Sequence, residues 1–214
     1  MEREWIEVPS MHGEVYQRLR EQIAVGRIQP GEKITIRQIA DAFGVSTMPV
    51  REALRKLQAE GLVVFERRSV TVRRLLPLEV EQTFAIRDRL ELLATEWAFA
   101  NFESTDIAQM RKMVQKMDEA QASRADWRVL NERFHFYLYR RCESEILIQA
   151  IETLWKSVDA YMHVYATGVS SLAHAQRQHH AMIDFIEKRN LKELLELTSI
   201  HLKETMETIL MHLG

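Results

Sequence analysis

Residues 44–54 carry the sequence GVSTMPVREAL, which decides the fold of the first part of the chain. Ser46 can cap a helix with its hydroxyl, and Pro49 fits the first helical turn, where a missing N–H costs nothing. Apolar residues recur at helical spacing and give this helix one apolar face: Val50, Ala53, Leu54 and Leu57. The opposite face carries a mostly polar and basic set that suits the major groove of DNA: Thr47, Met48, Arg51 and Arg55.

The neighbouring segments complete a winged helix-turn-helix, in which a β-hairpin follows the second of two closely linked helices. Thr35 and Gln38 form a candidate capping box for the preceding helix, and a glycine follows that helix as a stop signal. Two runs of β-forming residues, 62–65 and 70–72, flank a basic tip and predict the hairpin. We therefore expect a DNA-binding domain over residues 1–76.

Several side chains of this domain are expected to contact DNA. Arg51 is the best candidate for two hydrogen bonds to one guanine, while Arg37 lies on the preceding helix and would meet a phosphate or a base edge. Arg67 and Arg68, at the tip of the hairpin, would meet phosphates or enter the minor groove. The full predicted set is Arg37, Ser46, Thr47, Met48, Arg51, Arg55, Arg67 and Arg68.

Four short motifs lie along this domain. They are GRIQPGEKI at 26–34, IADAFGVS at 39–46, PVREAL at 49–54 and EGLV at 60–63. Together they resemble the GntR family of bacterial transcription regulators. Thr47 stands where that family often has arginine, and Ser69 where it usually has the glycine of the hairpin, so the half-site sequence and the turn geometry do not carry over.

The charge is distributed unevenly along a chain whose formal net charge is −2. Residues 1–76 hold 13 Lys and Arg against 10 Asp and Glu, a net +3, whereas residues 77–214 hold 16 against 21, a net −5. Phosphate neutralisation supplies much of the affinity for DNA, so one modestly basic domain should bind weakly. We expect a homodimer that places two such domains on a palindromic operator.

The composition is that of a soluble cytoplasmic protein. The chain has 214 residues, enough for two small domains with a core of their own. Its single cysteine, Cys142, allows no internal disulfide, which suits a reducing compartment. No uncharged apolar run approaches the roughly 18 residues of a membrane helix, and we expect no association with a membrane.

From Pro77 onward the pattern changes to helices alone. No proline follows in the last 137 residues, and apolar residues recur at spacings of three and four. Six helices are predicted, at roughly 77–101, 105–122, 125–142, 145–167, 171–189 and 191–213. The short connections favour an antiparallel bundle over residues 77–214. The fold class is therefore mainly α, a winged helix-turn-helix domain followed by a six-helix bundle.

The spacing of three histidines predicts a shared polar site inside the bundle. Asn131 and His135 are four residues apart and share one helix face. His179 lies about 11 residues before the predicted turn at 190–191 and His201 about 10 after it, so the two reach the same level of a helical hairpin. Three imidazoles and an amide oxygen suit zinc, nickel, iron or manganese. Unrelated core or surface histidines are the plain alternative.

The segment NERFH at 131–135, with His179 and His201, is similar to the all-helical effector domain, called FCD, of the FadR-type branch of the GntR family. The resemblance implies a divalent metal held by one aspartate and three histidines, with a small organic acid bound beside it. Asn131 replaces the aspartate, which should weaken metal binding because a carboxylate is the better donor for a hard cation. Six helices resemble the VanR-like subgroup.

Arg87 and Glu91, four residues apart, have two interpretations. Such a pair more often supports the fold. An arginine fork is also the usual partner of a carboxylate, and the resemblance places an arginine at this position, so Arg87 is a candidate effector contact.

These features favour a metabolite-responsive transcription regulator, a repressor released by an organic acid, with no catalytic residues. A metal-dependent hydrolase or oxygenase is the main alternative, since three histidines with an open position can activate water. No general base stands beside them, and Asn131 cannot serve as one. A third interpretation is an architectural DNA protein that binds no effector, but it gives the helical bundle no function.

Overall fold

The structure is a computed structural model that describes residues 10–66, 69–120, 123–168 and 172–213. Within these ranges, only the backbone is described for residues 159–160, 163–165 and 167–168. The chain divides into two compact units, Met1–Arg74 and Leu75–Gly214. No helix of the described residues is both long and apolar enough to span a membrane.

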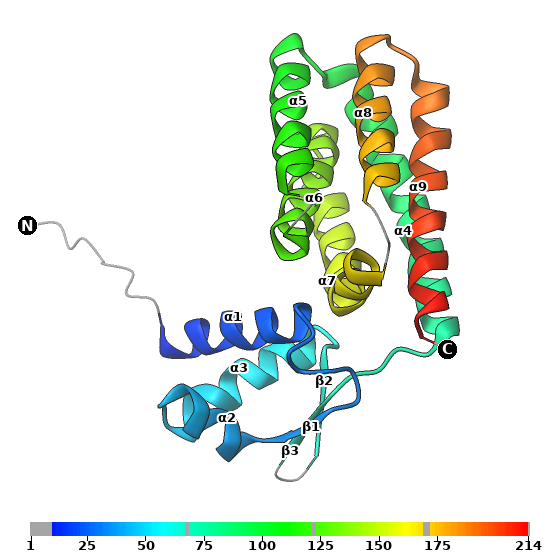
Figure 1. The fold of residues 1–214 in the computed structure, drawn as a ribbon. Coiled ribbons are helices and arrows are strands. Elements are labelled where there is room, and N and C mark those ends of the chain that lie inside the picture. Colours follow the sequence, from blue (N-terminus) through cyan, green and yellow to red (C-terminus); the bar gives the residue numbers. More distant parts are fainter. Residues whose placement is uncertain (1–9, 67–68, 121–122, 169–171, 214) are drawn as a thin grey trace, which may run out of the picture. The chain divides into compact units, whose positions relative to one another are not determined.

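The first unit contains three helices and a three-stranded antiparallel sheet (Figure 1). Its elements are α1 (Met11–Ala24), β1 (Lys33–Thr35), α2 (Ile36–Phe43), α3 (Thr47–Ala59), β2 (Val63–Phe65) and β3 (Ser69–Val72). The predicted hairpin is β2 and β3, in which Val63 pairs with Val72. The prediction missed a third strand, β1. It pairs with β3, so β3 is the central strand of the sheet. Three residues are too few to give a periodic signal.

Local caps fix both ends of α2. The capping box is present, because the Gln38 backbone N–H donates to Thr35 Oγ1 at 3.2 Å and the Thr35 N–H donates to Gln38 Oε1 at 2.9 Å. Gly44 then ends α2 in the left-handed conformation, with a φ of 65°.

The predicted cap of α3 by the Ser46 hydroxyl is wrong. Ser46 occupies the N-cap position in an extended conformation, but its side chain makes no capping hydrogen bond. An N-cap side chain accepts from the second or third backbone N–H of the helix, and the third residue here is Pro49, which has none. The proline that suits the first turn thus removes one of the two donors of the cap.

The second unit contains the six predicted helices (Figure 1). They are α4 (Pro77–Ala98), α5 (Ser104–Glu119), α6 (Arg124–Tyr139), α7 (Glu145–Gly168), α8 (Ala173–Glu187) and α9 (Leu191–Met211). Short 3-10 turns, η1 (Phe99–Asn101) and η3 (Arg140–Cys142), extend α4 and α6. Helix α4 packs against α7 and α9, and α5 packs against α6 and α8.

A tight turn joins α8 to α9. Arg189 adopts a left-handed conformation with a φ of 55°, and the Asn190 N–H donates to the Phe185 carbonyl at 2.8 Å. The two helices therefore run antiparallel and side by side (Figure 1). His179 of α8 and His201 of α9 lie at the same level, with ring centroids 4.9 Å apart.

Candidate functional site

Three histidines from three helices meet inside the helical unit. His135 lies on α6, His179 on α8 and His201 on α9, and their side chains are buried. One ring nitrogen of each lies within 4.8 Å of those of the other two. The ring centroids are 4.9–5.2 Å apart, so the three imidazoles form one cluster and are not separate core histidines.

A glutamine fixes the orientation of the His179 ring. The Gln176 amide donates to Asp118 Oδ1 at 2.7 Å, and the indole N–H of Trp127 donates to Gln176 Oε1 at 3.1 Å. Gln176 Oε1 is therefore an acceptor, and it lies 2.9 Å from His179 Nδ1. Nδ1 must carry the proton, which leaves the lone pair of His179 on Nε2.

Hydrogen bonds at Nδ1 also orient the rings of His201 and His135. The Gln178 amide donates to Glu204 Oε2, so its oxygen accepts from His201 Nδ1 at 2.7 Å. His135 Nδ1 lies 3.3 Å from the Tyr139 hydroxyl, whose own proton goes to Glu91. All three histidines therefore keep a lone pair on Nε2. The sequence predicted the histidines and missed these partners.

Burial holds the three histidines in the neutral form. It lowers the pKa of His135 and of His179 well below the usual value, and the pKa of His201 to about 4. The charge of Arg87 adds to this effect at His135 and His201. Neutral imidazole is the form that binds a metal ion, so no proton has to leave near neutral pH.

Two buried atoms of the cluster lack a hydrogen-bond partner among the described residues. They are His179 Nε2 and Asn131 Oδ1, both lone-pair donors to a metal. Asn131 is 2% exposed and lies one turn before His135 on α6. A buried polar atom without a partner is costly, so the residues present fit a divalent metal.

Arg87 and Glu91 lie beside this cluster and form a buried ion pair. Arg87 Nε donates to Glu91 Oε1 at 2.7 Å, and Glu91 also accepts from the Tyr139 hydroxyl and the Trp155 indole. The guanidinium lies 4.6 Å from the ring centroid of Phe84 and 4.5 Å from that of Trp155. The pair supports the fold, as expected, yet one terminal nitrogen of Arg87 has no hydrogen-bond partner among the described residues.

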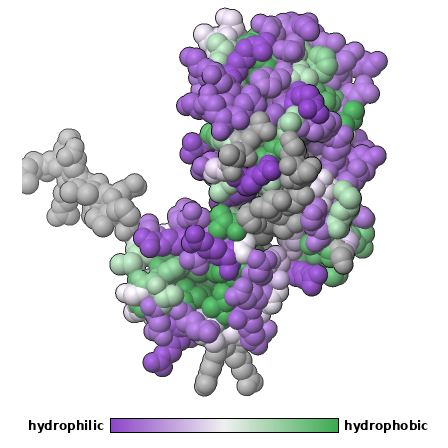
Figure 2. All heavy atoms as spheres, viewed as in Figure 1, coloured by the Kyte–Doolittle hydropathy of each residue, from purple (hydrophilic) through white to green (hydrophobic). Residues whose placement is uncertain are grey.

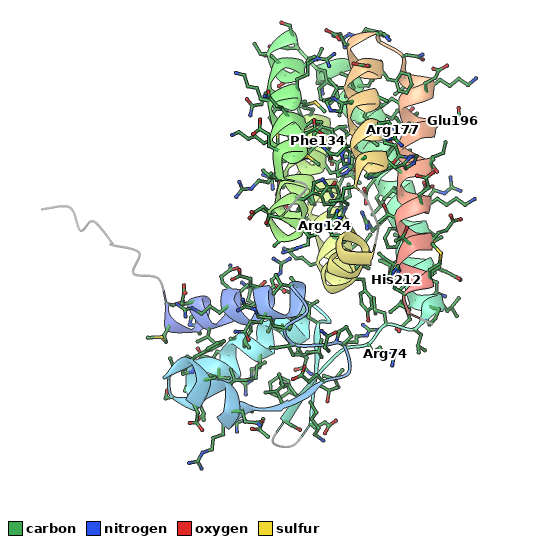
Figure 3. All side chains as sticks on the ribbon, viewed as in Figure 1. Arg74, Arg124, Phe134, Arg177, Glu196 and His212 are labelled. Atoms are coloured by element: carbon green, nitrogen blue, oxygen red, sulfur yellow. The ribbon has the colours of Figure 1, made fainter. Side chains whose placement is uncertain are left out.

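A small cavity separates Arg87 from the histidines. Its volume is about 10 Å³, on the order of one water molecule. The lining includes Arg87, Glu91, Asn131, His135, His201 and Thr205. Trp155 is the aromatic residue of the lining. Phe134, which projects from α6 into the bundle (Figure 3), contacts the histidine cluster instead, with its ring centroid 5.0 Å from that of His179.

Helix α3 presents the other predicted site. Its apolar face is buried, as predicted, whereas Thr47, Met48, Arg51 and Arg55 are exposed. Met48 is 63% exposed. Arg37 of α2 is also exposed, and its Nε lies 3.9 Å from Asp41 Oδ2. The predicted contacts Arg67 and Arg68 lie outside the described residues.

Comparisons with known proteins agree with both units. The family described as "Bacterial regulatory proteins, gntR family" matches residues 12–72, and the FCD domain matches residues 82–204. The HTH-type transcriptional regulator McbR of Escherichia coli (strain K12) is 29% identical over 148 residues, 68% of this chain and 67% of that protein. The uncharacterized HTH-type transcriptional regulator YdhC of Bacillus subtilis (strain 168) is 26% identical over 196 residues, 90% of this chain and 88% of that protein.

A solved structure of E. coli McbR/YncC shares the fold, with a TM-score of 0.82 at 22% identity over 96% of this chain and 99% of that one. The chain therefore belongs to the GntR family of bacterial transcription regulators, in the FadR-type branch with an FCD domain. Regulators of this family bind DNA, and the FCD domain binds ligands. The VanR-like subgroup stays a prediction.

Proposed function

We propose that this regulator is a homodimeric repressor that a small organic acid releases from a palindromic operator. One observation supports this proposal most: the free nitrogen of the buried Arg87 guanidinium, beside the cavity that Asn131, His135 and His201 also line. A buried guanidinium with an unused donor is a partner for a carboxylate.

The size of the cavity suggests how binding of the acid couples to DNA. A cavity of about 10 Å³ does not accommodate an organic acid, so lining side chains must move when one enters. Such a ligand favours an arrangement of the helices that the free protein rarely adopts. It can change DNA affinity only by its differential affinity for the two arrangements, typically about 1–3 kcal/mol.

A divalent metal would be held by Asn131, His135, His179 and His201. When bound, it would supply a fixed positive charge for the acid's second polar group. Gln176 and Gln178 orient two of the imidazoles whether or not an ion is present. Among the lining residues, the carboxylate of Glu91 already accepts from three donors, so it is not a free general base for hydrolysis.

On the DNA side, α3 would enter the major groove. Arg51 would recognise a guanine, Arg55 and Arg37 would lie near the backbone or the base edges, and Thr47 and Met48 would contact base edges. Ser46, whose hydroxyl makes no capping bond, remains available for a phosphate.

The test is capture and sequencing of fragmented genomic DNA by the purified protein at physiological salt. We expect a few enriched fragments that share a palindrome. Candidate acids are then titrated against the captured fragment, and one should weaken binding by about 5- to 150-fold. Capture of bulk DNA without enrichment would contradict the regulator, and enrichment without any acid response would contradict the effector site alone.

The Asn131→Asp variant should bind zinc more tightly than the wild type. A carboxylate brings a negative charge to a cluster of otherwise neutral donors, so we expect at least a roughly tenfold lower Kd, about 1.4 kcal/mol. His179→Ala should lose zinc uptake. Equilibrium dialysis and the metal-induced rise in Tm measure both effects.

Gln109→Glu is the matched control, because it adds the same charge at an exposed position on α5. Its zinc affinity should equal that of the wild type. If His179→Ala retained full uptake, the histidine cluster would not be the metal site.

A further inference from the structure

Two chains of hydrogen bonds lead from the surface of the helical unit to the histidine cluster. Each runs from a carboxylate through a glutamine amide to Nδ1 of a buried histidine. The chains are Asp118–Gln176–His179 and Glu204–Gln178–His201. Their outer ends lie on α5 and α9, whose face in Figure 2 is mostly hydrophilic, and their inner ends are buried. The chains thus connect surface carboxylates with two imidazoles that a metal would use.

The amide of the first chain is held at several points. The Gln176 amide group also lies 3.4 Å from the Val114 carbonyl, and the Trp127 indole N–H donates to the amide oxygen at 3.1 Å. A carbonyl only accepts and an indole N–H only donates. Two partners besides Asp118 therefore require the same direction of this amide.

The amide of the second chain depends on one residue. The Gln178 amide group donates to Glu204 Oε2 at 2.7 Å, and its oxygen accepts from His201 Nδ1 at 2.7 Å. Among the residues that the structure describes, this side chain has no other hydrogen-bond partner. The same carboxylate oxygen lies 2.9 Å from Nε2 of His174, which helps to hold Glu204 in place. Since a carboxylate only accepts, Glu204 keeps the Gln178 oxygen turned toward His201.

A reversed Gln178 amide would change the chemistry of the cluster. Its NH₂ group would donate to His201 Nδ1, which would place the ring proton on Nε2. That proton would occupy the lone pair that a metal needs. It would also bring a donor to a cluster in which His179 Nε2 and Asn131 Oδ1 lack a partner among the described residues. The metal-free protein would therefore gain from the reversal.

We infer that Glu204 is a positioning residue that keeps the cluster able to bind a metal. Its carboxylate fixes the direction of the Gln178 amide and, through it, the tautomer of His201. Asp118 has no equivalent role, because the glutamine that it contacts has two other partners. The inference rests on the proposed metal site, but the tautomer can be measured without a metal.

The test is the Glu204→Gln variant, whose new amide can either accept from Gln178 or donate to it. Long-range proton–nitrogen NMR spectra of the metal-free protein distinguish the two imidazole tautomers, and we expect His201 to gain the Nε2–H form. Equilibrium dialysis should show a zinc Kd about 10- to 100-fold higher than that of the wild type. The free energy of unfolding of the metal-free protein should not fall, a result that a merely structural role of Glu204 would not give.

The exchanged variant E204Q/Q178E tests the order of the groups in the chain. Its carboxylate lies next to His201, where it can accept only from Nδ1–H, and its outer amide can donate to that carboxylate. The wild-type tautomer and zinc affinity should both return. Glu207→Gln removes the same charge at an exposed position of α9 and is the matched control. This control and Asp118→Asn should leave the tautomers unchanged.

Three results would overturn the inference. They are an unchanged His201 tautomer in Glu204→Gln, a changed tautomer with unchanged zinc affinity, and an exchanged variant that does not recover the wild-type tautomer. A wild type that takes up no zinc, with tautomers that respond as expected, would instead remove the metal from the proposed function. Control of the tautomer by Glu204 would then remain.

Discussion

Replacing Glu91 with alanine is expected to lower the free energy of unfolding by about 3–5 kcal/mol, because the Arg87 guanidinium stays buried without its counter-charge. Arg87 is 2% exposed and Glu91 is fully buried, so water does not take the place of the lost carboxylate. The Tyr139 hydroxyl and the Trp155 indole lose an acceptor as well. Urea unfolding followed by circular dichroism measures the change.

Two further variants separate the buried charge from other effects. Glu81→Ala, at an exposed position of the same helix, should stay within about 0.5 kcal/mol of the wild type. Arg87→Met combined with Glu91→Leu should recover most of the stability, since apolar residues of similar volume often replace a buried pair at little cost. A loss below about 1 kcal/mol in Glu91→Ala would mean that Arg87 reaches water.

Replacing Arg51 with alanine is expected to weaken operator binding by about 2–6 kcal/mol, since each arginine–guanine contact provides about 1–3 kcal/mol and a dimer makes two. Arg51 is exposed on α3, so the substitution should leave the fold unchanged. Fluorescence anisotropy against the captured operator, and against a scrambled duplex of equal length, measures the loss at physiological salt.

The comparison of the two duplexes decides the role of Arg51. A loss on the operator alone indicates base recognition, whereas an equal loss on both indicates a phosphate contact. Arg18→Ala, on α1 and paired with Glu14, should bind the operator as the wild type does. Unchanged operator affinity of Arg51→Ala would remove this face of α3 from the DNA interface.

The features that the sequence predicted correctly depend on residues close together in the chain. The capping box of Thr35 and Gln38 and the left-handed Gly44 each lie within one turn of the helix end that they define. The six helices were predictable for the same reason, because no proline interrupts the apolar spacing after Pro77.

The incorrect or missing predictions depend on partners that the local pattern does not contain. Serine before a helix predicts a cap, but Pro49 removes one of the two backbone N–H groups that could donate to it. Strand β1 exists because it pairs with β3, far along the chain. Edge strands of three residues carry no periodicity of their own.

The histidine cluster was likewise predictable in part: the positions of the histidines were predicted, and their hydrogen-bond partners were not. His135 follows Asn131 by one helical turn, and His179 and His201 are nearly equidistant from the α8–α9 connection. Helix geometry alone was therefore enough to predict that these residues lie close together. Gln176 and Gln178 were missed because their role depends on which way the imidazole rings face. The small volume of the cavity likewise depends on packing that no spacing reveals.

Helix α4 holds the buried Arg87 and Glu91 on one face and the exposed apolar side chains of Ile86 and Trp97 on another. A substitution that shifts this helix to admit a larger acid therefore also displaces these exposed apolar side chains. In descendants of this chain, α4 should therefore change slowly.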